Sequence, residues 1–162
     1  MIASELRAEH SRVSELTSAK WENVDLARGE WVIPHSKGKA DQSFTVPLVP
    51  VVVGWFRELQ SYSFKSAYVL PARESRRIAL VGDDVHFSQL TLNAILNKLC
   101  RRLPGVRRFT PHDLRSTARS HLSSLGVGVI VSERCLNHSL GGLLAIYDQH
   151  DYLTERREAL QR

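Results

Sequence analysis

The sequence predicts an α+β fold that is mostly α-helical and contains one small antiparallel β-sheet. The 162 residues are 43% hydrophobic and 24% charged, an ordinary globular composition that excludes a disordered or low-complexity chain. Apolar residues recur at helical spacing in several segments, and only two short segments have the composition of strands. This length suits one domain, so we expect residues 1–162 to form a single domain.

The first part of the chain is expected to hold a helix and then a β-hairpin. Residues 4–20 place isolated apolar side chains among polar ones, as a surface helix does. After the turn at Arg28-Gly29, Trp31–Ile33 is the first predicted strand and Phe44–Val46 the second. The polar stretch 35–42 lies between them, so the hairpin has a basic tip.

A helix and a long irregular segment are expected to follow the hairpin. Pro47 and Pro50 end the second strand, and Val51–Tyr62 has the pattern of an amphipathic helix. Tyr68–Pro71 is expected to be a short buried segment, and the polar residues 73–87 form the longest loop. The inward residues of the amphipathic helix are expected to be Trp55, Phe56 and Leu59.

The second half of the chain is predicted to be helical. Thr110 is a natural N-cap, Pro111 suits the first helical position, and Asp113 lies three residues after the cap. This helix is expected to run through Leu125 and to stop at Gly126. Three more helices are expected, at Ser88–Arg102, Val129–Asn137 and Leu144–Gln161.

The charge balance suggests a polyanionic partner. Lysine and arginine total 22 against 17 aspartate and glutamate, a formal net charge of +5 that a mildly basic soluble protein would also carry. Cys100 and Cys135 do not make a disulfide framework and fit a reducing, intracellular setting. No run of about 18 apolar residues is present to span a membrane.

His112 and Arg115 are three residues apart at the start of the helix predicted from Thr110, so they share one of its faces. Free backbone N–H groups and the helix dipole favour an anion at this position, and the arginine adds a bidentate fork for phosphate. A solvated helix face is the simpler interpretation of this pair taken alone.

His138 and Tyr147 are a second candidate pair. One continuous helix would place residues nine apart on opposite sides, but a break at Gly141-Gly142 would let both face one pocket. Tyr147 could equally be a half-buried aromatic residue, and Tyr152 in the same predicted helix competes with it.

Basic residues near the N-terminus and in the hairpin complete the set. Arg12 precedes Glu15 by three residues and could simply pair with it on a surface helix. Lys37 and Lys39 lie at the predicted hairpin tip, and their simpler interpretation is that they keep an exposed turn soluble.

Together these positions resemble the catalytic domain of the tyrosine recombinases, and most closely the phage-type and genomic-island integrases. That family carries an Arg-x-x-Glu-Leu segment, a hairpin lysine, a His-x-x-Arg helix, a later His or Trp, and a Tyr about nine residues after it. Connecting segments such as FTPHDLRSTARSHL agree too, so the resemblance covers nearly the whole chain. The matching positions, in the family's order, are Arg12, Lys39, His112, Arg115, His138 and Tyr147.

The resemblance implies the fold of the DNA breaking-rejoining enzymes and a strand cleavage that needs neither metal nor cofactor. Tyr147 would be the nucleophile that attacks a phosphodiester, which gives a 3′-phosphotyrosyl link and a free 5′-hydroxyl. Arg12 and Arg115 would stabilise the charge that develops on the nonbridging oxygens.

The same resemblance assigns the proton transfers. His112 and His138 would hydrogen-bond the phosphate and help move the tyrosine proton. Lys39 would protonate the leaving 5′-oxygen from the hairpin tip, with Lys37 as the other candidate for this role.

The implied biology is the integration or excision of a phage or mobile element. The implied partners are double-stranded DNA attachment sites, three further copies of the chain in a homotetramer on that DNA, and DNA-bending accessory proteins. The free protein would be a monomer or weak oligomer in the bacterial cytoplasm, with no membrane partner.

The chain departs from the family's pattern in three respects. His10-Ser11 stands where a Thr-Gly pair is usual, and Asn137 replaces the glycine before the second histidine. No core-binding or arm-binding domain precedes the catalytic residues, so we expect a C-terminal fragment.

Three other functions stay open at this stage. The chain could be a non-catalytic, DNA-binding remnant of an integrase, or a helix-turn-helix regulator that uses the segment from Arg115 to Asn137. A zinc protein that uses Cys135 and His138 lacks the usual ligand spacing.

Overall fold

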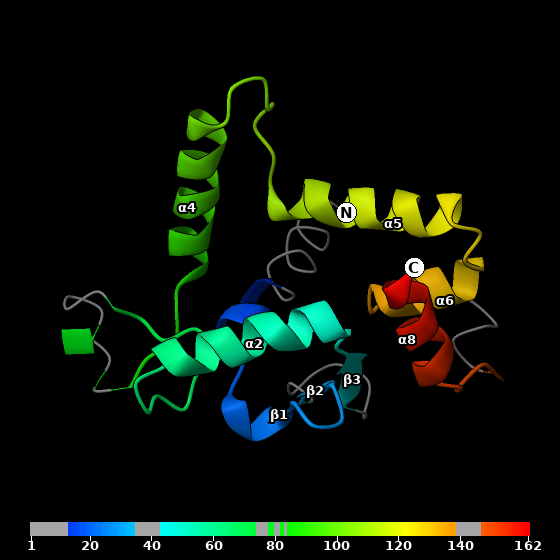
Figure 1. Ribbon diagram of the computed structural model, residues 1–162, viewed down its shortest axis with the longest axis horizontal. Coiled ribbons are helices and arrows are strands. Elements are labelled where there is room, and N and C mark those ends of the chain that lie inside the picture. The colour runs from blue at the N-terminus through cyan, green and yellow to red at the C-terminus, as the bar shows by residue number, and fades with distance from the viewer. Residues whose placement is uncertain (1–12, 35–42, 74–77, 80–81, 83, 139–146) are drawn as a thin grey trace.

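The computed structural model describes residues 13–34, 43–73, 78–79, 82, 84–138 and 147–162. It is mostly helical and contains one three-stranded antiparallel sheet, so the predicted fold class is confirmed. Figure 1 shows the sheet beneath helix α2, with α4 and α5 extending above them. Within the described residues, no helix is long and apolar enough to cross a membrane.

The sheet has the order β1-β2-β3, with strands Val24–Asp25, Glu30–Ile33 and Phe44–Pro47. The two predicted strands pair as a hairpin, and Ile33 lies opposite Phe44 at its last described register position. The sequence did not predict β1, because two residues are too few to show an alternating pattern.

The turn between β1 and β2 requires glycine. Gly29 has φ +63°, and a Cβ atom built there would lie 2.8 Å from the carbonyl oxygen of Leu48. The N–H of Leu48 donates to the carbonyl of Gly29 at 2.8 Å. The backbone therefore approaches itself too closely at this turn for any side chain, and the turn predicted at Arg28-Gly29 is confirmed.

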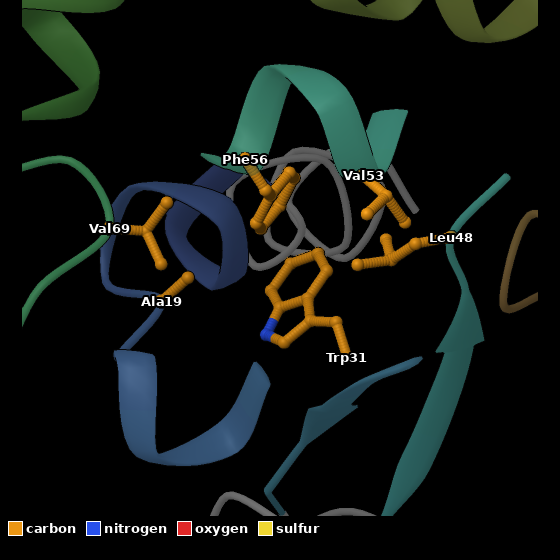
Figure 2. Close-up of a cluster of buried hydrophobic side chains, with 6 residues drawn as sticks. All are labelled: Ala19, Trp31, Leu48, Val53, Phe56 and Val69. Carbon is orange, nitrogen blue, oxygen red and sulfur yellow. The ribbon is translucent and has the colours of Figure 1, made fainter. Parts of the chain in front are cut away.

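The main core lies between the sheet and α2, which spans Pro50–Tyr62. Figure 2 shows Trp31 of β2 directed toward Val53 and Phe56 of α2, the two buried residues of that helix. Trp55 was predicted to face inward, but it is 59% exposed. Successive helix residues are rotated by about 100°, so the burial of Phe56 turns its neighbour outward.

Two helices begin at side-chain caps, and the cap at Thr110 was predicted. In α4, Gln89–Arg102, the Ser88 hydroxyl accepts from the N–H of Thr91 at 3.0 Å. In α5, Pro111–Ser124, Thr110 and Asp113 form a reciprocal capping box. The bonds that Asp113 accepts from Thr110 hold the pKa of its carboxyl below the usual range.

Helix α4 is covered on little of its surface. Apolar residues recur along it at helical spacing, and among them Ile95 is 48% exposed and Leu99 is 43% exposed. Of the residues that the structure describes in α4, Cys100 alone is buried. Figure 1 shows α4 standing away from the sheet and α2.

The first helix ends earlier than the sequence indicates. Residues 13–17 are helical, whereas Lys20 forms an isolated antiparallel bridge with Tyr68 and is therefore extended. A short 3-10 helix, η1, follows at Trp21–Asn23. The bridge places Val69 in the core, where it is 1% exposed, so the buried segment predicted for Tyr68–Pro71 is confirmed at Val69, whereas its other residues are partly buried.

The last two helices are shorter than predicted. Helix α6 spans Val129–Cys135 and α8 spans Leu153–Gln161, so the continuous helix predicted for Leu144–Gln161 is wrong. Residues 148–152 are not helical, and Tyr152 has φ +55°. The Asp148 carbonyl, which a continuous helix would use internally, accepts instead from the side chain of Arg134 at 2.7 Å.

Arg156 connects α8 to the sheet. It is fully buried, and its guanidinium donates to the Thr45 carbonyl of β3 at 2.8 Å and to the Asp151 carboxylate at 2.7 Å. The guanidinium also lies over the ring of Phe44, 4.6 Å from its centroid. Helix α8 thus contacts β3 through Arg156, and it also packs against α6 (Figure 1).

We predict that Arg156→Ala lowers the free energy of unfolding by about 2–4 kcal/mol, because the Thr45 carbonyl loses its partner and a cavity forms. Urea unfolding measures the change. Arg57→Ala, at an exposed position of α2, is the matched control and should shift the value by less than about 0.5 kcal/mol. Equal stability of the two variants would contradict the assigned role of Arg156.

Candidate active site

The structure brings together two of the predicted site residues, Arg115 on α5 and His138 after α6. The Nε of Arg115 donates to Nε2 of His138 at 3.2 Å. The Nη2 of the same guanidinium donates to the Leu136 carbonyl. These bonds join positions 21 and 23 residues apart, so they depend on how α5 and α6 pack and not on local spacing.

The end of α6 places His138 beside Arg115. The N–H of His138 donates to the Glu133 carbonyl at 2.9 Å, and the N–H of Asn137 donates to the Arg134 carbonyl at 3.0 Å. These two bonds are the Schellman pattern, which needs a left-handed residue at the position of Asn137. Asn137 has φ +53°.

This geometry explains the departure from the Leu-Gly-His pattern. Asparagine is the residue that most readily replaces glycine in the left-handed region. The backbone path to His138 can therefore be retained although Asn137 stands in the place of glycine.

Glu133 supports His138 and was not predicted from the sequence. Its Oε2 accepts from Nδ1 of His138, and its Oε1 accepts from Nε of Arg119 at 2.6 Å. The bond to His138, followed by that to Arg119, holds the pKa of the Glu133 carboxyl below its usual range although burial opposes this. Glu133 is thus an ionised carboxylate between α5 and the histidine.

A sequence signal for Glu133 does exist in the end of α6. A Schellman motif brings the residue five positions before its last member close in space, and Glu133 is five positions before His138. An acidic residue at that spacing can therefore reach the ring. Arg119 had no such signal, because its approach to Glu133 depends on the packing of α5 against α6.

The hydrogen bonds define the protonation pattern of the neutral His138 ring. An arginine Nε can only donate, so Nε2 of His138 accepts and carries the lone pair. Its Nδ1 then carries the hydrogen and donates to Glu133.

Tyr147 is exposed at the surface. Its side chain is 80% exposed. The carbonyl of the next residue, Asp148, accepts from Arg134 of α6, the helix that also carries Glu133. The segment that holds Tyr147 is therefore attached to the helix that positions His138.

Tyr152 has a structural partner instead. Its hydroxyl donates to Oδ2 of Asp148 at 2.9 Å, and this bond raises the pKa of Tyr152 above its ordinary value. Its ring packs edge to face on His150 with centroids 4.5 Å apart. Tyr152 precedes α8 and does not share a helix with Tyr147, so the exposed Tyr147 is the better candidate nucleophile.

The other predicted positions divide into two groups. His112 is exposed and lies one turn before Arg115 on α5, at the end of the helix where the dipole is positive. Arg12, Lys37 and Lys39 lie outside the described residues, and so does the predicted break at Gly141-Gly142.

The described surface between α4 and α5 is basic. The segment that connects α4 to the start of α5 carries exposed arginines at its two ends, namely Arg101, Arg102, Arg107 and Arg108. In the described part of the chain, no three His, Cys, Asp or Glu side chains gather as a metal site requires. The arrangement suits a phosphate, which needs fixed cations and hydrogen-bond donors.

Comparison with solved structures identifies the fold as that of a tyrosine recombinase. The crystal structure of XerA recombinase superposes with a TM-score of 0.62 at 20% sequence identity, over 92% of this chain and 50% of that one. The chain also matches the Phage integrase family over residues 6–153, and it belongs to that family.

Individual relatives agree with this assignment. The chain is 28% identical to the prophage integrase IntA of Escherichia coli over 93% of its own length and 34% of that protein's. It is 33% identical to the tyrosine recombinase XerA of Thermococcus kodakarensis over 84% of its length and 45% of the relative's. The chain thus spans between a third and a half of the relatives that it matches. Membership disfavours a helix-turn-helix regulator or a zinc protein.

The left-handed residue before His138 can be tested directly. Asn137→Ala and Asn137→Gly both remove the amide, so their difference reports the backbone. We predict that the alanine variant is less stable by about 1 kcal/mol in urea unfolding, because its Cβ is strained at positive φ. Equal stabilities would contradict the Schellman ending of α6.

Proposed function

We propose that residues 1–162 form the catalytic domain of a site-specific DNA recombinase, which cuts and rejoins DNA through a 3′-phosphotyrosyl intermediate. The observation that carries this proposal is the Arg115–His138–Glu133 cluster in a phage integrase family fold, together with the exposed Tyr147, whose neighbour Asp148 is bonded to α6. A remnant that had lost catalysis would not need to keep this hydrogen-bonded arrangement.

In the proposed cleavage step, the Tyr147 oxygen attacks the scissile phosphorus and displaces the 5′-oxygen. The tyrosine proton passes to His138, and the leaving oxygen receives a proton from Lys39, or from Lys37 in the alternative assignment. The phosphodiester energy is kept in the new bond, so a 5′-hydroxyl can reverse the reaction without ATP.

The cations have a separate role. Arg115 and Arg12 would hydrogen-bond the nonbridging oxygens, where charge develops in the transition state. A guanidinium stays protonated at any relevant pH and offers two parallel donors. His112, one turn before Arg115, would donate to the same phosphate.

The partners follow from this chemistry. Double-stranded attachment-site DNA would contact the exposed arginines between α4 and α5, since phosphate contacts dominate affinity for DNA. Recombination between two duplexes requires four cleavages, which fits a homotetramer assisted by DNA-bending proteins. Integration or excision of a phage or mobile element in the bacterial cytoplasm is the proposed setting.

We predict a covalent protein–DNA adduct on Tyr147. The chain and its Tyr147→Phe variant are incubated with nicked duplexes from the junctions of the element that encodes it. An SDS-resistant adduct should form with the unaltered chain and disappear in the variant, because phenylalanine lacks the attacking oxygen. Peptide mapping locates the modified residue.

Tyr152→Phe is the matched control and should retain the adduct, because the Tyr152 hydroxyl is already bonded to Asp148. An adduct on Tyr152 would keep the family chemistry and overturn the choice of nucleophile. DNA binding without any adduct would favour a non-catalytic remnant.

Arg115→Lys tests the bidentate cation. We predict that it lowers the rate of single-turnover cleavage by about 10²–10³-fold, because a point charge replaces a fork aimed at the phosphate. DNA affinity should change little, since the charge is retained; a filter-binding assay at fixed salt checks this. A rate within twofold of the unaltered chain would remove Arg115 from the proposed site.

A further inference from the structure

The contacts of Glu133 go beyond what support of a helix end requires. Both carboxylate oxygens are used, one by Nδ1 of His138 and the other by Nε of Arg119 at 2.6 Å. The Nη1 of Arg119 also donates to the Ser123 hydroxyl, one turn further along α5. Arg119 is thus held at two points and prevents the Glu133 carboxylate from rotating.

The cluster is also sheltered from water. The exposed fraction is 26% for the Glu133 side chain, 25% for that of Arg119 and 36% for the His138 ring. Partial burial strengthens hydrogen bonds between charged groups, because water competes less for each of them. The ring of His138 therefore has a defined orientation before DNA binds.

The orientation has a chemical consequence. With Nδ1–H donated to Glu133, the lone pair of the neutral ring lies on Nε2, which faces α5 and Arg115. A proton taken up at Nε2 would create an imidazolium whose other N–H already points at a carboxylate. An acidic group in that position stabilises the charged ring and keeps the reactive nitrogen free of hydrogen.

We propose that Glu133 is a positioning residue for strand cleavage, which holds His138 so that its Nε2 accepts the proton of the attacking tyrosine. This inference rests on the proposed function and extends it to a residue outside the six predicted site positions. Arg119 acts one step further away, by fixing the carboxylate.

The proton moves in the same step as the displacement at phosphorus. The phosphate of the bound DNA takes the Arg115 guanidinium, which leaves the Nε2 lone pair available. The O–H bond of Tyr147 breaks as its oxygen bonds to phosphorus, and the proton moves to Nε2. The bond from phosphorus to the 5′-oxygen breaks, and the leaving oxygen takes its proton from the hairpin lysine. Glu133 keeps its charge throughout and gains an ion pair with the imidazolium.

The test is single-turnover cleavage of a nicked duplex by Glu133→Gln, which keeps the shape but removes the charge. We expect the rate to fall by roughly 10–100-fold, part of the 10²–10⁴ that acid–base catalysis contributes. Glu158→Gln, at an exposed position of α8, is the matched control and should cleave at the unaltered rate.

A double-mutant cycle separates this role from a structural one. Because Glu133 acts through His138, Glu133→Gln should cost less than twofold when added to His138→Gln. A full additional loss in that background would overturn the inference. Arg119→Lys should lower the rate by a smaller factor than Glu133→Gln.

Nitrogen NMR of the free chain tests the proposed orientation of the His138 ring without DNA. The neutral His138 ring, assigned by comparison with His138→Gln, should carry its hydrogen on Nδ1. A hydrogen on Nε2 would overturn the proposed orientation even if Glu133→Gln failed to fold. If the unaltered chain forms no adduct, the proposed function fails; if it does and Glu133→Gln cleaves equally fast, only the role of Glu133 fails.

Discussion

The bonds from Arg115 to the end of α6 are the constraint on which the site depends. One guanidinium donates to the Leu136 carbonyl and to the His138 ring, and so fixes the end of α6 against the face of α5. The ion pair between Arg119 and Glu133 adds a second connection one turn away. These bonds hold α5 and α6 together, so the two helices present a defined cluster of cation, imidazole and carboxylate. An anion entering this site would meet a guanidinium that is already held in a fixed position, and fixed cations favour electrostatic catalysis.

Two further connections relate this cluster to the rest of the fold. Arg134 of α6 donates to the carbonyl of Asp148, next to Tyr147, and Arg156 of α8 donates to the carbonyl of Thr45 in β3. Each guanidinium satisfies a main-chain carbonyl of another segment, and a buried carbonyl left unpaired would be costly. The segment of Tyr147, His138 and strand β3 are thus attached to adjacent elements, α6 and α8 (Figure 1). A shift of α8 would therefore displace both β3 and α6.

The local predictions succeeded where a short-range rule applies. The cap at Thr110 and the hairpin pairing were both predicted, because each depends on residues close in sequence. The long helix predicted for Leu144–Gln161 failed for the opposite reason. Its pattern is helical, but Arg134 takes the Asp148 carbonyl and Tyr152 adopts a left-handed conformation. Trp55 failed in a similar way, since periodicity defines a helical stripe but not which edge of it the core covers.

The sequence by itself determined the fold class and the start of α5 with His112 and Arg115 on one face. It also indicated Tyr147 as the candidate nucleophile, with Tyr152 as its competitor. It also determined how α6 ends before His138, since the left-handed conformation of Asn137 depends on the residue type at that position. Only the tertiary structure decided that Arg115 meets His138, that Glu133 and Arg119 support the ring, and that Tyr152 is bonded while Tyr147 is exposed. These contacts join residues from different elements, and the packing of those elements depends on the whole core and not on any spacing within one segment.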